Sequence, residues 1–219
     1  MTPAVTAEQV QSFMDVVQSR RSVRKYDSDT KISRDELKEI LTLASKAPSS
    51  SNMQHWRYLV IDSPERKQEL LPIANSQQQV VEASAVIAIL GDLEGWRNAD
   101  QIYRQAAEAG YMAPDLAKQF AERSTQMYSS LPKDRAREIA VIDASLAAMQ
   151  LMLVARAKGY DTVPMGGFDR EKFKAAFGLG DRYVPVMLIP IGKAAQEGHP
   201  TTRLPIEDVT FWNEVSPSH

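Results

Sequence analysis

The stretch APSSSNMQHWRYLVI, residues 47–61, joins a helical pattern to a strand-like pattern through a short, polar loop. Pro48 ends the helix before it, because the residue preceding a proline disfavours helical backbone. The apolar run at 58–61 indicates a buried strand after it. Three serines, Asn52 and Gln54 lie between the two. These side chains either cap and turn the chain or hold a polar ligand.

Outward from this loop, the spacing of apolar residues predicts mainly helices. Two helices begin at capping boxes, Thr6 with Gln9 and Ser33 with Glu36. A short helix is expected near 65–73. A long helix is predicted over 135–158. Its apolar stripe consists of Ile139, Ile142, Leu146, Met149 and Leu153.

The strands are few. Residues 84–92 and 183–192 read as buried strands, and 160–169 reads as a strand that leads into a glycine turn. Asp169 can cap a helix that ends at Gly178. Residues 93–134 have a weaker pattern with scattered aromatic residues, which indicates an inserted helical subdomain or lid. We therefore expect one α+β domain over 1–219, with a C-terminal tail at 198–219.

The composition excludes several kinds of binding partner and active site. A formal net charge of −2 on 219 residues gives no general attraction to nucleic acid or anionic membranes. The absence of cysteine excludes disulfides, thiolate nucleophiles and cysteine-ligated metal sites, and it fits a reducing compartment. The N-terminus shows no signal peptide, and the uninterrupted apolar runs are too short to span a bilayer. We expect a cytoplasmic protein with no membrane or nucleic-acid partner and no metal.

Two segments could bind a ligand. The segment RRSVR, with Arg20, Arg21, Ser22 and Arg24, is either a solvated basic loop or a phosphate cradle that Arg203 could complete. The segment PMGGFD holds two glycines that make a turn and also let backbone N–H groups approach a ligand. No GxGxxG or Walker motif is present. By default, Gln79 belongs to a helix end, and His55 and Trp56 are packing residues.

Four segments together resemble one family. RRSVRKY, LASKAPSSSNMQHW, YDTVPMGGFD, and YVPVMLIPIGKA followed by RLP are similar in order and spacing to the FMN-dependent nitroreductases, especially small NAD(P)H nitroreductases of Gram-positive bacteria. The resemblance covers about Val10 to Trp212. It implies a mostly antiparallel sheet flanked by helices, and a homodimer with FMN at the interface, each site built from both chains.

The resemblance also implies roles for individual residues. Arg20, Arg21 and Ser22 would hold the phosphate and ribityl chain, and Arg203 would complete the phosphate site. Arg24 and Gln79 would lie near the N1 and O2 edge of the flavin, and the Gly167 N–H near N5. The rest of the cofactor site would consist of Pro48, Ser49, Ser50, Asn52, Gln54, Pro164, Met165 and Gly166. The family often has proline where this chain has His55, so we expect a less rigid loop here.

The implied activity is hydride transfer from NAD(P)H through flavin N5 to nitroaromatic or quinone acceptors, by a ping-pong mechanism without a side-chain nucleophile or base. Alternatives on the same fold are an enone reductase, a ring dehydrogenase or a dehalogenase. A flavin-binding protein without turnover is another alternative. An ordinary helical interaction protein, with a merely solvated basic loop, is a third.

Overall fold

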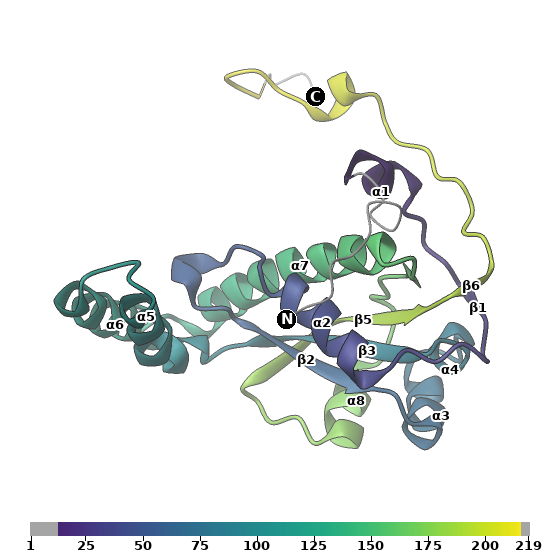
Figure 1. Cartoon of the computed structure of the whole chain (residues 1–219), viewed down its shortest axis with the longest axis horizontal. Coiled ribbons are helices and arrows are strands. Elements are labelled where there is room, and N and C mark those ends of the chain that lie inside the picture. Colours follow the sequence, from purple (N-terminus) through teal and green to yellow (C-terminus); the bar gives the residue numbers. More distant parts are fainter. Residues whose placement is uncertain (1–12, 216–219) are drawn as a thin grey trace.

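A four-stranded antiparallel sheet forms the centre of the computed structural model, which describes residues 13–215 (Figure 1). Its strands run in the order β2 (Trp56–Ile61), β3 (Ala85–Asp92), β5 (Tyr183–Gly192) and β4 (Asp161–Thr162). Every residue of β3 is buried, because strands flank it on both edges and helices cover both faces. The capping box expected at Thr6 lies outside the described residues.

Alternate residues of β3 face two separate cores, as the two-residue period of a strand requires. Ile87 and Ile89 pack with α2 (Arg34–Ala44) and α7 (Lys133–Ala157). Val86 and Ala88 face the opposite core. That core is built with helices α3 (Pro64–Ile73), α4 (Gln79–Glu82) and α8 (Arg170–Phe177).

The helix α7 packs on the sheet through small side chains. A Cβ added at Gly91 of β3 would lie 3.1 Å from the Ala140 Cβ, so helix and strand are in close contact. The buried face of α7 is mainly alanine. The apolar stripe identified in the sequence is mostly on another face: Ile142, Leu146 and Met149 are 50%, 43% and 41% exposed.

This exposed stripe makes α7 unusually apolar for a helix on a protein surface. Over 18 residues its mean hydropathy reaches 1.7, which by length and composition is enough to cross a bilayer, although no uninterrupted apolar run is that long. Half of that window is buried inside the fold. The helix is therefore a core element with a second apolar face left uncovered in the single chain.

Two peripheral segments also expose apolar side chains. The helix α1 (Phe13–Ser19) buries Val16 but exposes Phe13, Met14 and Val17. Strand β1 (Lys25–Tyr26) pairs with β6 (Ala194–Gln196). Beyond β6, residues 197–215 form an extended arm that runs away from the sheet and past α1 (Figure 1). It contains the short 3₁₀ helix η4 (Ile206–Val209) and exposes Leu204, Ile206, Val209 and Trp212.

The helical segment predicted over 93–134 is present. After the 3₁₀ helix η3 (Gly95–Asn98), α5 (Ala99–Glu108) and α6 (Pro114–Ser129) pack against each other at one end of the molecule (Figure 1). The scattered aromatic residues have a structural reason, because Tyr103 and Tyr128 are buried in a small core of their own.

Candidate functional site

The polar loop between α2 and β2 has a strained backbone. Ser51, Asn52 and Gln54 have φ angles of 48°, 58° and 54°, in the left-handed region that residues other than glycine rarely adopt. Ser51 and Asn52 lie in the 3₁₀ helix η2 (Ser50–Asn52). Such conformations persist only where surrounding contacts impose them, and they concentrate at functional sites.

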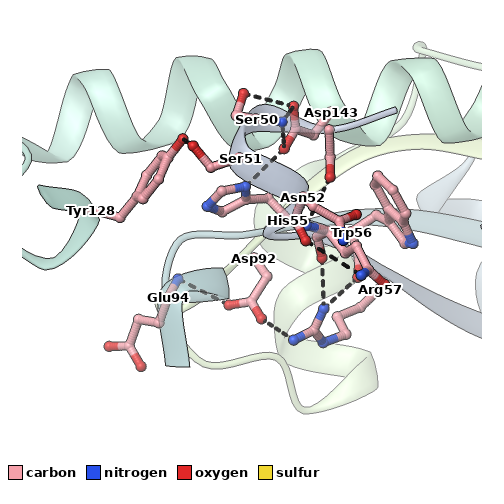
Figure 2. A network of polar contacts seen from close by, with 12 residues as sticks. Ser50, Ser51, Asn52, His55, Trp56, Arg57, Asp92, Glu94, Tyr128 and Asp143 are labelled. Atoms are coloured by element: carbon pink, nitrogen blue, oxygen red, sulfur yellow. Dashed lines mark hydrogen bonds and ion pairs between the residues drawn. The ribbon is translucent and has the colours of Figure 1, made fainter. Parts of the chain in front are cut away.

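A buried carboxylate on α7 imposes part of this shape (Figure 2). Asp143 is 1% exposed. One of its oxygens accepts hydrogen bonds from the Ser50 N–H at 3.1 Å and the Ser50 hydroxyl at 3.0 Å. The other lies 2.8 Å from Nδ1 of His55. Both ends of the loop are thus attached to one carboxylate.

The helical insertion holds the middle of the loop. The Tyr128 hydroxyl donates to Oγ of Ser51 at 2.9 Å, and the Tyr103 hydroxyl donates to the Ser51 carbonyl at 3.1 Å. The Tyr128 ring also packs on His55, with ring centroids 5.3 Å apart. Ser51 is therefore fixed in its left-handed conformation from α5 and α6.

His55 has a different role from the one its replacement of proline suggested. We expected a less rigid loop, but the imidazole is 3% exposed and bound to Asp143. A Cβ at Gly95 would lie only 2.5 Å from its Cδ2, so the ring is tightly enclosed. Ser50, His55 and Asp143 lie together, but the Ser50 hydroxyl and the His55 imidazole both bind the Asp143 carboxylate. This arrangement does not present an activated serine.

The exit of the loop rests on a second buried carboxylate, Asp92 at the end of β3 (Figure 2). Arg182 donates two hydrogen bonds of 2.7 Å to it, and Arg57 forms an ion pair at 2.6 Å. Arg57 also donates to the carbonyls of Gln54 and Trp56. Burial raises the pKa of Asp92, but the hydrogen bond from Arg182 and the charge of Arg57 outweigh burial and hold the pKa below its ordinary value.

We expect Asp92→Asn to lower the free energy of unfolding at pH 7 by about 1–3 kcal/mol, since it removes charged hydrogen bonds from two arginines that are 32% and 31% exposed. The lowered pKa of Asp92 means that the wild-type carboxylate stabilises the fold above about pH 4 and loses this contribution as the pH falls through the folded pKa. The difference between the two proteins should therefore shrink at acid pH. Urea unfolding between pH 7 and pH 3 measures it.

Asp181→Asn is the control, because that carboxylate pairs with Lys174 at the exposed surface. A constant difference between Asp92→Asn and wild type across this pH range would contradict the assignment.

The basic loop lies between α1 and β1, beside the start of the C-terminal arm. Ser22 forms a parallel bridge with Thr162, and Val23 N–H donates to the Thr162 carbonyl at 3.2 Å. Arg21 donates only to backbone carbonyls, those of Gln18 and Arg20. Among residues 13–215, the arginines with no carboxylate within ion-pair distance include Arg20, Arg21, Arg24 and Arg203.

Gly198 brings the arm against this loop. A Cβ at Gly198 would lie 2.7 Å from the Arg21 Cβ and 2.9 Å from the Ser22 carbonyl oxygen, closer than real side chains approach. A cavity of about 60 Å³ beside this contact is lined in part by Ser22, Arg24 and His199. Only glycine permits the arm to pass here.

The glycine turn after β4 forms a third part of the candidate site. Met165 is buried and bridges to Leu188, whereas Pro164, Gly166 and Gly167 are exposed. A Cβ at Gly166 would meet no atom within 4 Å. Asn75 and Gln77 donate to the Gly167 carbonyl at 3.0 and 3.1 Å, which fixes the turn.

Gln79 lies at the start of α4, beneath the glycine turn. Its amide is buried and donates to Oε1 of Gln77 at 3.0 Å, and it contacts the Met165 sulfur at 3.7 Å. Lys67, also buried, donates to the carbonyls of Val81 and Ala83 and so holds the other end of α4. Burial lowers the pKa of Lys67.

The structure joins some predicted site residues and separates others. Gln79, Met165 and Gly167 form one connected group, and Ser49, Ser50 and Gln54 belong to the loop network, where Ser49 Oγ accepts from the Gln54 N–H. Pro48 and Asn52 are exposed beside that network. Arg203 lies on the arm, where its guanidinium donates hydrogen bonds to the Thr201 hydroxyl and the Thr202 carbonyl. Within the described part of one chain, no hydrogen bond or ion pair links it to the loop that carries the other candidate arginines.

The residues of this arrangement that were not identified from the sequence include Tyr103, Tyr128, Asp143 and Gly198. The sequence does mark Asp143 as unusual, because it is the only charged residue between Glu138 and Arg156 in an otherwise apolar helix. A lone acid on such a helix needs a buried partner. The tyrosines and Gly198 gave no comparable pattern.

Comparison with known proteins agrees with this geometry. Residues 17–193 match the sequence profile described as "Nitroreductase family". The chain is 48% identical to a Bacillus subtilis protein provisionally named NAD(P)H nitroreductase YodC, over 91% of this chain and 98% of the relative. It is 40% identical to the CLA biosynthesis enone reductase of Lactiplantibacillus plantarum, over 86% and 88% of the two chains.

A solved structure from Exiguobacterium sibiricum has the same fold. It is provisionally described as a nitroreductase in complex with FMN, and it superposes with a TM-score of 0.89 at 47% identity, covering 93% of this chain and 98% of that one. The predicted α+β fold is thereby confirmed.

Proposed function

Because this chain belongs to the nitroreductase family, we propose that it is an FMN-dependent oxidoreductase that uses NAD(P)H to reduce nitroaromatic or quinone acceptors. The relatives named as NAD(P)H nitroreductases and the related FMN complex support the activity and the cofactor. We assign the activity to the cytoplasm, in keeping with a chain that has no cysteine.

The assignment of FMN as the cofactor rests on the positive charge of the basic loop. Arg20, Arg21 and Arg24 lie close together in sequence and, within residues 13–215, have no carboxylate partner. Eight other arginines of the described chain are paired with acids. Unpaired guanidinium groups with a neighbouring serine hydroxyl fit a phosphate group.

The glycine turn suits the planar part of the same cofactor. With no side chain at Gly166 and open space above it, a flat ring can lie directly against the backbone. The fixed carbonyl of Gly167 leaves its neighbouring N–H groups in a defined orientation. The residues present therefore fit FMN.

When bound, FMN would accept a hydride from NAD(P)H and pass it to the acceptor. Arg20, Arg21 and Ser22 would bind the phosphate, with Arg203 as a further contact. Arg24 would place a positive charge where negative charge develops during reduction, and preorganised charge of this kind lowers the barrier. The loop residues Ser49, Asn52 and Gln54 would supply polar contacts, and α5 and α6 would limit the acceptors that can enter.

We also propose that the protein acts as a homodimer with two composite sites. The apolar stripe of α7, the exposed face of α1 and the extended arm are all uncovered in a single chain. Exposed apolar patches of this kind mark protein interfaces. A second copy would cover all three at once, which also explains the apolar face of α7 without a membrane.

We expect the purified protein to be yellow and to follow ping-pong kinetics. One site must serve NAD(P)H and acceptor in turn, so double-reciprocal plots at several fixed NAD(P)H concentrations should be parallel lines. Anaerobic mixing with NADH or NADPH should bleach the flavin absorbance, and the FMN-free protein is the control. Intersecting lines without substrate inhibition would argue for a ternary complex, and slow bleaching would indicate a flavin-binding protein without turnover.

Reduction of an enone is a second candidate. The relative named CLA biosynthesis enone reductase is 40% identical, and the solved structure of a CLA enone reductase superposes with a TM-score of 0.84. An acceptor panel containing nitroaromatics, quinones and α,β-unsaturated ketones distinguishes the two activities, because the preferred acceptor should give the highest kcat/KM.

A further inference from the structure

We propose that Asp143, together with His55 and Tyr128, is a positioning group that holds the 49–55 loop in its ligand-binding shape. This inference rests on the proposed function for its ligand, FMN. It concerns residues outside the predicted cofactor contacts. Asp143 lies on α7 and Tyr128 on α6, and neither is assigned to touch the cofactor.

The backbone of the 49–55 loop has an unfavourable conformation. Three residues within four positions, Ser51, Asn52 and Gln54, adopt left-handed φ angles. Asparagine tolerates this region better than serine or glutamine, so the loop's own preferences do not produce this shape. External contacts must supply the missing stabilisation, and they must do so before a ligand arrives for the loop to be preorganised.

Asp143 is the best-placed source of that stabilisation. Its carboxylate receives three hydrogen-bond donors from two ends of the loop, the amide and hydroxyl of Ser50 and the imidazole of His55 (Figure 2). Donors on a carboxylate make stronger bonds than neutral pairs do. The contact fixes the distance between positions 50 and 55, and the left-handed residues lie between them.

Tyr128 completes the support from outside the loop. Its hydroxyl binds the Ser51 side chain, and its ring covers His55. The small cavity beside them is lined by apolar residues such as Leu131 and Ile139 and leaves no room for water. Water therefore cannot enter on this side of the His55 and Tyr128 rings.

In this role, His55 restricts the loop backbone through side-chain contacts, whereas a proline would restrict it through its covalent ring. A proline at this position would limit the backbone directly. Here the imidazole is locked by Asp143, Tyr128 and Gly95. The helical insertion is thus a support for the loop as well as a wall of the site.

The test compares FMN affinity with fold stability in four variants. Asp143→Leu removes every polar contact at similar volume, and Asp143→Asn keeps an oxygen acceptor for Ser50. Tyr128→Phe removes one hydroxyl and keeps the ring. Ser84→Ala is the matched control, because its hydroxyl accepts one buried hydrogen bond from the Ile32 N–H at 2.7 Å, away from the loop.

We expect Asp143→Leu to raise the Kd for FMN at least about tenfold, and Tyr128→Phe roughly two- to tenfold, the range of one neutral hydrogen bond. Asp143→Asn should recover part of the loss. Ser84→Ala should be less stable to urea yet bind FMN as wild type does. Hydrogen exchange of residues 49–55 in the FMN-free protein should be faster than wild type in Asp143→Leu and Tyr128→Phe, intermediate in Asp143→Asn and unchanged in Ser84→Ala.

Unchanged exchange and FMN affinity in Tyr128→Phe and Asp143→Asn would overturn the positioning role, even if Asp143→Leu failed to fold. Losses of affinity that simply follow stability, with Ser84→Ala included, would do the same. Faster loop exchange in Asp143→Leu and Tyr128→Phe than in wild type, combined with a wild-type protein that binds no FMN, would leave the positioning role standing and refute the proposed cofactor.

Discussion

Leu146→Asp should yield a monomer that no longer retains FMN. Leu146 is 43% exposed at the centre of the α7 stripe, between Ile142 and Met149. In the proposed dimer this stripe is covered by the second copy, so the substitution buries an unpaired carboxylate in an apolar interface. Such a charge costs several kcal/mol. A loss of about 4 kcal/mol weakens association roughly thousandfold, which is sufficient to dissociate the dimer at micromolar concentration.

Sedimentation velocity with simultaneous detection at the flavin absorbance measures assembly and cofactor together. Tyr111→Asp is the matched control, because it adds the same charge at an exposed aromatic residue between α5 and α6. A Leu146→Asp protein that remained dimeric would refute the α7 interface. A monomer with full FMN occupancy would refute the composite site but not the family activity.

Gly198→Ala should weaken FMN binding by about ten- to a hundredfold. The new Cβ would lie 2.7 Å from the Arg21 Cβ and 2.9 Å from the Ser22 carbonyl oxygen, and neither atom is the end of a flexible side chain. The basic loop is hydrogen-bonded to Thr162, so the arm and this loop must move apart under strain. Displacement of binding groups by about 1 Å can cost on the order of a hundredfold in function.

Gly180→Ala is the matched control, since a Cβ there meets no atom within 4 Å. Isothermal titration of the FMN-free proteins with FMN gives both dissociation constants. Equal affinities would show that the basic loop tolerates displacement, and the phosphate assignment would then need another set of cations.

Much of the fold follows from the spacing of apolar residues, and its failures have identifiable causes. The strand at 183–192 agrees with its predicted bounds, because an uninterrupted apolar run suits a strand covered on both faces. The predicted strand at 160–169 shortens to Asp161–Thr162 plus a bridge at Met165. Pro164 has no N–H for a ladder there, and the chain must turn at the two glycines.

The sequence predicts less of the candidate site than of the fold. Motif order predicts a site at the basic loop and the glycine turn, because each of these is a contiguous segment. The contacts that shape the 49–55 loop come from Tyr103, Tyr128 and Asp143, which are far away in sequence. Spacing along one chain carries no information on such long-range pairs, so His55 was interpreted as a packing residue without its partner.

The strand order has a consequence for how the protein is made. β3 takes its first partner, β2, from the preceding residues, but its second partner, β5, begins 91 residues after β3 ends. At about 5–20 residues per second, a ribosome needs roughly 5–20 s to synthesise that interval. During this time one edge of the most buried strand has no neighbour on the nascent chain. The arm is synthesised later still, so its contribution to the proposed dimer comes only after β5 is available to close the sheet.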